Sequence, residues 1–220
     1  MNSFDGNIDL SLLKDQIYKS LKMQIIMGKL EPGSRISTLE IANSMNVSCA
    51  PVREAVNMLS KDGLIMMNPR KQPVVKDISL DEEEMITELR IMIEPYAARK
   101  SVHNVTTEKI NKAELLIEEI TKDPTNFEKY IESDLKVHQL IYDNTGFSIL
   151  KEVLNMLQDH SLRMRYLPEE KSKYKEEIMT VSTKEHQEIL DALRNGNEDL
   201  VEKAVYKHMK KSQGRFVEKK

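Results

Sequence analysis

The order of local signals in residues 36–75 constrains the fold of this chain more than any other feature. Ser37 and Glu40 form a capping box, in which each side chain can bond a free backbone amide of the first helical turn. A turn follows at residues 45–47, and Ser48 is expected to cap a second helix. In that helix, apolar residues recur at steps of three and four, at Val52, Ala55, Val56, Leu59 and Leu64. The region therefore predicts two short amphipathic helices joined by a tight turn.

A short hairpin is expected directly after the second helix. Residues 62–63, Asp-Gly, end that helix, and the stretches 65–67, Ile-Met-Met, and 74–76, Val-Val-Lys, indicate two strands. The loop between the strands carries two cations, Arg70 and Lys71. Helix, turn, helix and basic hairpin occur here in the order of a winged helix-turn-helix, whose usual partner is duplex DNA.

Residues 25–36 and 47–55 carry the pattern of a known family. The first segment holds a glycine and a Leu-Glu-Pro-Gly turn, and the second is Val-Ser-Cys-Ala-Pro-Val-Arg-Glu-Ala. Together with the helices and the hairpin, they resemble the N-terminal domain of GntR-family transcription regulators of the FadR-like branch. The resemblance implies that residues 1–78 form a winged helix-turn-helix domain that binds double-stranded operator DNA.

Candidate DNA contacts follow from how helix-turn-helix proteins dock. The second helix is expected to enter the major groove, with Ser48 and Arg53 facing bases or phosphates. The wing residues Arg70 and Lys71, and Arg35 before the first helix, are expected to meet phosphates. These contacts would set the register of the domain on DNA.

Two positions depart from the family pattern. Cys49 stands where relatives usually have Arg, and Gln72 stands where the wing usually has Gly. Cys49, next to Ser48, is itself a candidate DNA contact. Because a cysteine cannot form the bidentate contact that Arg makes with a guanine, the operator sequence cannot be taken from relatives. A thiol at a DNA surface could sense oxidation, but we interpret Cys49 as a small side chain without that role.

The remainder of the chain has the pattern of a helical bundle. Residues 1–78 hold ten Lys and Arg against eight Asp and Glu, whereas residues 79–220 hold 23 against 28, which fits a DNA-binding head on an acidic body. Helical spacing is expected over residues 80–102, 107–121, 127–144, 148–167, 184–194 and 198–217. The charged run 169–177 is left open between a mobile loop and a solvated helix face. The predicted fold class is mainly α: a winged helix-turn-helix with a small β-hairpin wing over 1–78, then an all-α antiparallel bundle over 79–220.

Other classes of protein fit the composition poorly. The single cysteine excludes an internal disulfide, and the N-terminus lacks the layout of a signal peptide. No apolar run approaches the roughly 18 to 20 residues needed to span a bilayer. The chain is therefore expected to be soluble and cytoplasmic.

Four residues of the body could form a metal site. Asp134 and His138 are four apart on an expected helix, so both project from one face. His186 and His208 lie on separate later helices. Brought together in a bundle, they would give a site with three imidazoles and one carboxylate. Alone, each element is a weak signal, because a single histidine on a helix is more often structural.

The body also resembles the FCD ligand domain, the usual C-terminal partner of FadR-like proteins. The resemblance covers about residues 80–215 and rests on Leu89-Arg90-x-x-Ile93-Glu94-Pro95, Asp134-x-x-x-His138, Glu185-His186-x-x-Ile189-Leu190-x-Ala192-Leu193 and His208. It implies that Asp134, His138, His186 and His208 hold a divalent metal inside the bundle. Zinc is the first expectation, with nickel or manganese as alternatives. His103 and His160 lie outside the pattern.

The same resemblance implies an effector site beside the metal. A free coordination position could accept an oxygen of a small carboxylate, such as a hydroxy acid, a sugar acid or a dicarboxylate. Arg90 either faces that cavity and pairs with the carboxylate, or pairs with Glu94 within its own helix. Further candidates to line the cavity are Arg163, Arg165, Ser182 and Thr183.

The sequence thus predicts a transcription regulator, with repression relieved by the effector as the expected mode. A homodimer would match a pseudo-palindromic operator with its two heads. A regulator that senses the metal itself, or holds it for structure alone, is the main alternative. A mononuclear metal enzyme is disfavoured, because no general base, Gly-rich phosphate loop or nucleophile motif is evident.

Overall fold

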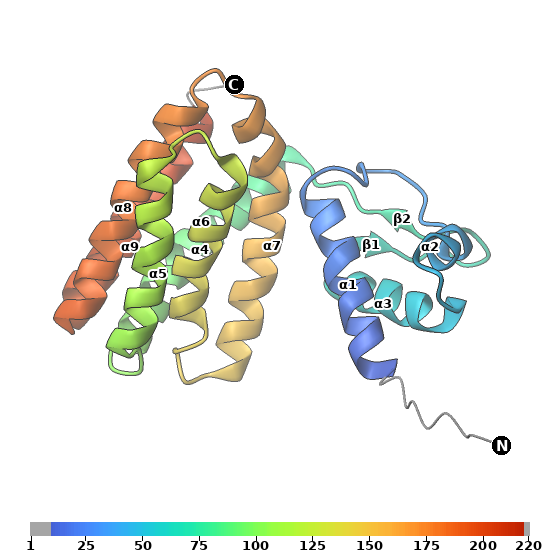
Figure 1. Cartoon of the computed structure of the whole chain (residues 1–220), viewed down its shortest axis with the longest axis horizontal. Helices are drawn as coiled ribbons and strands as arrows, with labels where there is room; N and C mark the ends of the chain where they lie inside the picture. The colour runs from blue at the N-terminus through green and yellow to red at the C-terminus, as the bar shows by residue number, and fades with distance from the viewer. Residues whose placement is uncertain (1–9, 218–220) are drawn as a thin grey trace. The chain divides into compact units, whose positions relative to one another are not determined.

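The computed structural model describes residues 10–217, apart from the side chains of residues 10–12, 167, 168, 216 and 217. The chain divides into two compact units, Met1–Ser79 and Leu80–Lys220 (Figure 1). Each unit has its own hydrophobic core.

The first unit has the winged helix-turn-helix fold. Within residues 10–79, its elements are three helices and a two-stranded antiparallel hairpin: α1 (Leu10–Ile26), α2 (Thr38–Met45), α3 (Cys49–Lys61), β1 (Ile65–Met66) and β2 (Val74–Val75). In the hairpin, Ile65 lies opposite Val75 and Met66 lies opposite Val74. The predicted fold class of this region is confirmed.

Local signals place the turns of this unit largely where the sequence predicts them. The Ser37 hydroxyl accepts a hydrogen bond of 3.3 Å from the Glu40 amide at the start of α2. Asn46 ends α2 in the left-handed conformation, with φ 54°. Ser48 stands at the N-cap of α3, but its side chain makes no capping hydrogen bond. In the wing the left-handed residue is Arg70, with φ 62°, and not Gln72.

Helix α1 is an element that the sequence analysis did not identify. Its residues Ile17, Leu21 and Ile25 are buried at steps of four, in one cluster with Val52 and Leu59 of α3. The helix therefore supplies one wall of the core on which α3 rests.

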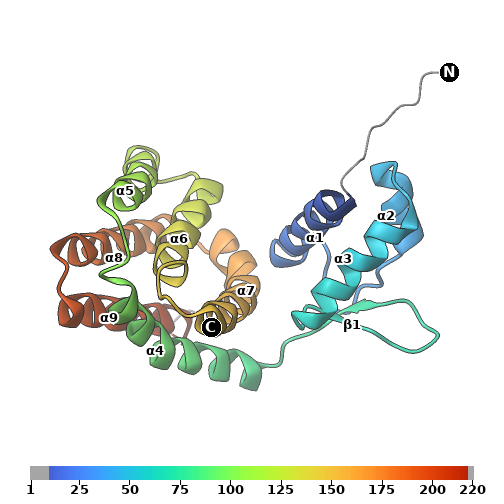
Figure 2. The same ribbon diagram turned by 90° about the horizontal axis from the view of Figure 1, so that it is seen from below.

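The second unit is an all-α bundle, as predicted. Its helices are α4 (Leu80–Ser101), α5 (Thr107–Lys122), α6 (Phe127–Tyr142), α7 (Ser148–Lys171), α8 (Lys175–Asn195) and α9 (Glu198–Val217). Helix α6 contacts α4, α5, α7 and α8, and α4 packs along α7 and α9. In Figure 2, α6 lies between α5 and α7. No helix within residues 10–217 is long and apolar enough to cross a membrane.

The charged run 169–177 is mostly helical. Helix α7 continues to Lys171, α8 begins at Lys175, and residues 172–174 form the break between them. Helix α8 thus starts nine residues before the expected position 184. Its added turns bury Ile178 and Met179. Because a charged run directly precedes these two residues, the sequence did not show that the helical apolar pattern begins there.

Candidate metal centre

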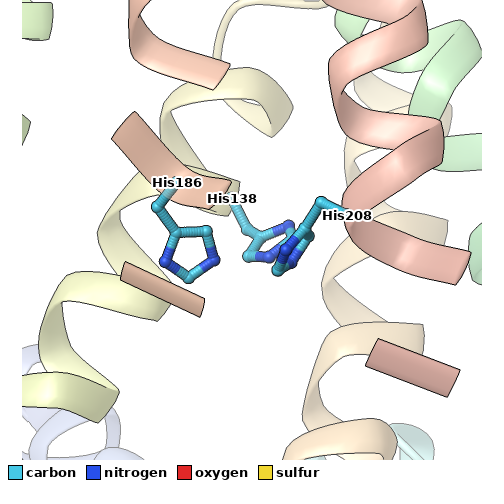
Figure 3. A group of neighbouring side chains, drawn as sticks. All are labelled: His138, His186 and His208. Carbon is cyan, nitrogen blue, oxygen red and sulfur yellow. The ribbon is translucent and has the colours of Figure 1, made fainter. Parts of the chain in front are cut away.

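Three histidines from three helices converge inside the second unit. His138 comes from α6, His186 from α8 and His208 from α9. Each residue offers a ring nitrogen within 4.8 Å of the nitrogens offered by the other two, and the rings lie close together (Figure 3). All three residues are at most 3% exposed. Because α6 contacts α8, and α8 contacts α9, the bundle itself fixes this arrangement.

Asp134 lies beside the histidines, one turn before His138 on α6. Its Oδ1 is 3.6 Å from Nε2 of His186, and its Oδ2 accepts a hydrogen bond from Arg165 of α7. Among residues 10–217, neither Oδ1 of Asp134 nor Nε2 of His186 has a hydrogen-bond partner. The structure thus brings all four predicted ligands into one buried region.

Two glutamates contact the outer nitrogens of two of these histidines. Glu94 of α4 places Oε2 2.8 Å from Nδ1 of His138, and Glu185 of α8 places Oε2 2.9 Å from Nδ1 of His208. A carboxylate at Nδ1 favours the tautomer with the proton on that atom, which leaves the Nε2 lone pair for a cation. Both rings can therefore offer Nε2 to a common ion.

The carboxylates of the site are held in the charged form. Burial opposes the charge on Asp134, but Arg165 and the nearby imidazoles outweigh it and hold the pKa of Asp134 well below its usual value. Burial likewise opposes the charge on Glu94, and Arg90 together with His138 lowers the pKa of Glu94 to about 2. Both residues are therefore anionic at neutral pH, so the candidate ligand Asp134 is in the form that binds a metal.

Burial has the opposite consequence for the imidazoles. It lowers the pKa of His186 well below 6.5, and the neighbouring His208 adds to the effect. Burial also lowers the pKa of His208, although the hydrogen bond with Glu185 works against that change. Neutral imidazole is the form that binds metal ions.

Arg90 adopts the intrahelical pairing that the sequence left open as one alternative. Its Nε donates to Oε1 of Glu94 at 2.5 Å, and its Nη1 donates to the Ser161 hydroxyl of α7 at 2.5 Å. Arg90 is 4% exposed. The other candidate effector residues are also buried in this unit: Arg163, Arg165, Ser182 and Thr183.

Sequence reasoning missed the outer residues of the site. Glu94 was considered only as a possible partner of Arg90 within the helix, Glu185 was part of a motif without an assigned role, and Arg165 was proposed only to line a cavity. Spacing along the chain does not show that a carboxylate of α4 meets an imidazole of α6. Only Glu185 could have been suspected from the sequence, because it directly precedes the candidate ligand His186.

The donor set fits a divalent ion. Three neutral imidazoles and one carboxylate suit zinc or nickel, and the carboxylate also suits manganese. Such an ion would also give a partner to two buried atoms, Oδ1 of Asp134 and Nε2 of His186. Neither atom has a hydrogen-bond partner within the described part of the chain.

The candidate DNA-binding residues lie on the first unit. Arg35, Ser48, Arg53, Arg70 and Lys71 are exposed, and Cys49 is half-buried. Arg35 pairs through its backbone with Val74 of the wing. A hollow of about 490 Å³ there is lined by Arg35, Asn68, Lys71, Gln72 and Val74. The structure thus groups Arg35 with Lys71, while Ser48 and Arg53 lie on the cap and the first turns of α3.

Two family descriptions match the chain. The description "FCD domain" matches residues 84–211. The description "Bacterial regulatory proteins, gntR family" matches residues 13–75. Together they cover both units of the structure.

Relatives and solved structures agree with these matches. The chain is 28% identical over 196 residues to an uncharacterized HTH-type transcriptional regulator, YdhC of Bacillus subtilis, covering 88% of this chain and 86% of the relative. It is 27% identical over 199 residues to the HTH-type transcriptional repressor RspR of Escherichia coli, covering 90% of this chain and 86% of the relative.

The solved structure of E. coli McbR/YncC matches with a TM-score of 0.79 at 21% identity, covering 94% of this chain and 97% of that one. A transcriptional regulator structure from Rhodococcus matches with a TM-score of 0.73 at 17% identity, covering 93% and 97%. At these identities, the two structures show likeness of fold.

Proposed function

Because the chain belongs to the GntR family of bacterial transcription regulators and carries an FCD domain, we propose that a small anionic metabolite, bound at the metal centre, controls its affinity for operator DNA. Regulators of this family bind operator DNA through the winged helix-turn-helix. The proposed setting is the cytoplasm, where bacterial DNA lies.

The observation that carries the proposal is the convergence of His138, His186 and His208 beside Asp134. These side chains would hold the ion, with zinc as the first candidate and nickel or manganese as alternatives. Four protein ligands leave a position free on an ion that takes five or six neighbours. The bound ion would supply a Lewis-acidic point that an effector carboxylate or hydroxyl oxygen can occupy.

The buried arginines favour an anionic effector. Arg163 and Arg165 are buried residues of α7, and Arg165 is the residue that pairs with Asp134. Displacement of a guanidinium from its present partner would let it pair with a carboxylate in two parallel hydrogen bonds. Arg90 is a weaker candidate, because it would have to leave both Glu94 and Ser161.

Repression is the proposed direction of control. The relatives RspR of E. coli and NanR of Enterobacter are both named as transcriptional repressors. An effector that weakens operator binding would then switch transcription on.

A homodimer is the proposed assembly, and one face of α4 supports it. Met85, Met92 and Tyr96 are 49%, 72% and 49% exposed, and with Leu89 they recur at steps of four and three. The helix begins with acidic residues and ends with basic ones, including Lys100. Two copies of α4 packed antiparallel would place each acidic end near a basic end, with Met85 of one copy opposite Tyr96 of the other.

The assembly is tested by sedimentation of a Met92→Glu variant. We expect a monomer, because a charge would be buried in the interface. Leu115→Glu is the matched control, since Leu115 on α5 is 58% exposed and lies off this face. A dimer that survives Met92→Glu would place the interface elsewhere.

The central experiment is metal analysis of the untagged protein, purified without chelator, followed by operator-binding titrations with candidate acids. A bound divalent ion and an acid that changes operator affinity would support the proposal. If chelation unfolds the protein, the metal is structural, and if it abolishes only the response to acids, the metal is an effector platform. If operator affinity changes with the metal concentration and not with any acid, the protein is a metal sensor.

A further inference from the structure

Glu94 connects the metal centre to α4 and α7. Its Oε2 lies 2.8 Å from Nδ1 of His138 on α6, and its Oε1 accepts from Nε of Arg90 at 2.5 Å. Arg90 in turn donates to Ser161 of α7. Glu94 is fully buried, with 0% exposure. One carboxylate thus ties a ligand imidazole to the packing of two other helices.

The next residue weakens α4 at that point. Pro95 lies inside the helix, and a proline has no amide hydrogen to donate to the carbonyl one turn earlier, at Ile91. The turn that carries Glu94 therefore has one backbone hydrogen bond fewer than an ordinary helical turn. Contacts made by the Glu94 side chain matter more for the order of this turn than they would elsewhere in α4.

Helix α4 is also the first element of the second unit in chain order. It starts at Leu80, directly after the unit that ends at Ser79. Any change in the order of α4 therefore occurs in the helix to which the DNA-binding unit is joined.

Glu185 offers an internal comparison. It makes the same kind of contact, to Nδ1 of His208 at 2.9 Å, but it belongs to α8 and also pairs with Arg215 of α9 at 3.1 Å. Within the described residues, its hydrogen bonds and ion pairs are with α9, so it positions a ligand imidazole without a hydrogen bond to α4. The two glutamates should share an effect on metal affinity and differ in their effect on α4.

We propose that Glu94 is the positioning residue through which metal binding at His138 is transmitted to the Glu94–Pro95 turn of α4. A cation held by Nε2 of His138 would polarise the ring and strengthen the hydrogen bond from Nδ1–H to the Glu94 carboxylate. The strengthened bond holds the Glu94 side chain, and with it the turn that Pro95 weakens. Metal binding then orders the middle of α4. This inference rests on the proposed metal centre.

The test is hydrogen exchange of the full chain with and without Zn²⁺, in the wild type, Glu94→Gln and Glu185→Gln. We expect each variant to bind zinc about 10- to 100-fold more weakly, in competition with a chelator. At saturating zinc, the wild type and Glu185→Gln should gain protection at the amides of residues 90–99. Glu94→Gln should gain little there, although its site is filled.

Two results would overturn the inference about Glu94 and leave the proposed metal centre intact. One is a wild type that binds zinc but shows no added protection in residues 90–99. The other is equal protection in Glu94→Gln. If the wild type binds no divalent ion, the proposed metal centre fails, and the inference fails with it.

A second measurement needs no variant. Imidazole ¹⁵N resonances of the zinc-bound wild type should show His138 protonated at Nδ1 and coordinated through Nε2. Coordination through Nδ1 would exclude the hydrogen bond to Glu94 and refute the proposal, even if Glu94→Gln fails to fold.

Discussion

Oδ1 of Asp134 and Nε2 of His186 lie 3.6 Å apart on neighbouring helices, and neither has a hydrogen-bond partner in the part of the chain that the structure describes. Buried polar atoms in folded proteins nearly always have partners. A carboxylate oxygen and an imidazole nitrogen that face each other without a hydrogen bond are a pair that a cation would bridge. The other two imidazoles lie beside this pair.

Replacement of His138 should abolish metal binding. We expect about one divalent ion per chain in the wild type and close to none in His138→Ala, because the ion would lose one of four ligands. Elemental analysis after dialysis measures the content. His103→Ala is the matched control, since the His103 side chain is 68% exposed and lies outside the site. Equal metal content in wild type and His138→Ala would remove this residue from the centre.

The metal-free protein should lose stability as the pH falls through about 6.5. Burial lowers the pKa values of His186 and His208 in the folded state, whereas the unfolded chain has the ordinary value of 6.5. Below that pH the unfolded state binds more protons than the folded state, so the free energy of unfolding decreases. Asp134, Glu94 and Glu185 act in the same direction only at lower pH, below their unfolded pKa values of 3.8 and 4.5.

Urea unfolding between about pH 7.5 and about pH 5.5 isolates the histidine effect, because carboxylates with ordinary pKa values stay ionised over most of that window. His186→Gln should flatten the dependence, and His103→Ala should leave it unchanged. An unchanged slope in His186→Gln would mean that burial of this ring does not control stability in acid.

The sequence predicted the fold class and the four residues that gather in the bundle, because each depended on spacing along one helix or on a motif. Asp134 and His138 share a face of α6 by their spacing alone. Their outer partners depend on how separate helices pack, so no local pattern reveals that Glu94 meets His138 or that Arg165 meets Asp134. The start of α8 was missed because Ile178 and Met179 directly follow a run of charged residues.

The pair formed by Arg165 and Asp134 should be costly to break. Both side chains are almost fully buried, and removal of one partner from a buried ion pair destabilises a protein by about 3 to 5 kcal/mol. We expect Arg165→Met to lower the free energy of unfolding of the metal-free protein by that amount. Zinc should stabilise Arg165→Met more than the wild type, because the ion then becomes the remaining cation beside Asp134. Chemical denaturation with and without zinc measures both effects, and an equal gain from zinc would argue against metal contact with Asp134.

The wing should contribute charge and not sequence preference to DNA binding. Arg70 and Lys71 are exposed at the tip of the hairpin, and each phosphate contact contributes about 0.9 to the slope of log K against log salt concentration. We expect Lys71→Ala to weaken binding to a short random-sequence duplex and to reduce that slope by about one. Fluorescence anisotropy over a range of salt concentrations measures it. Lys112→Ala is the control, because Lys112 is exposed on α5 of the other unit and pairs with Glu108. If both variants reduce the slope equally, the wing has no special role, and the cations that meet phosphates must lie elsewhere.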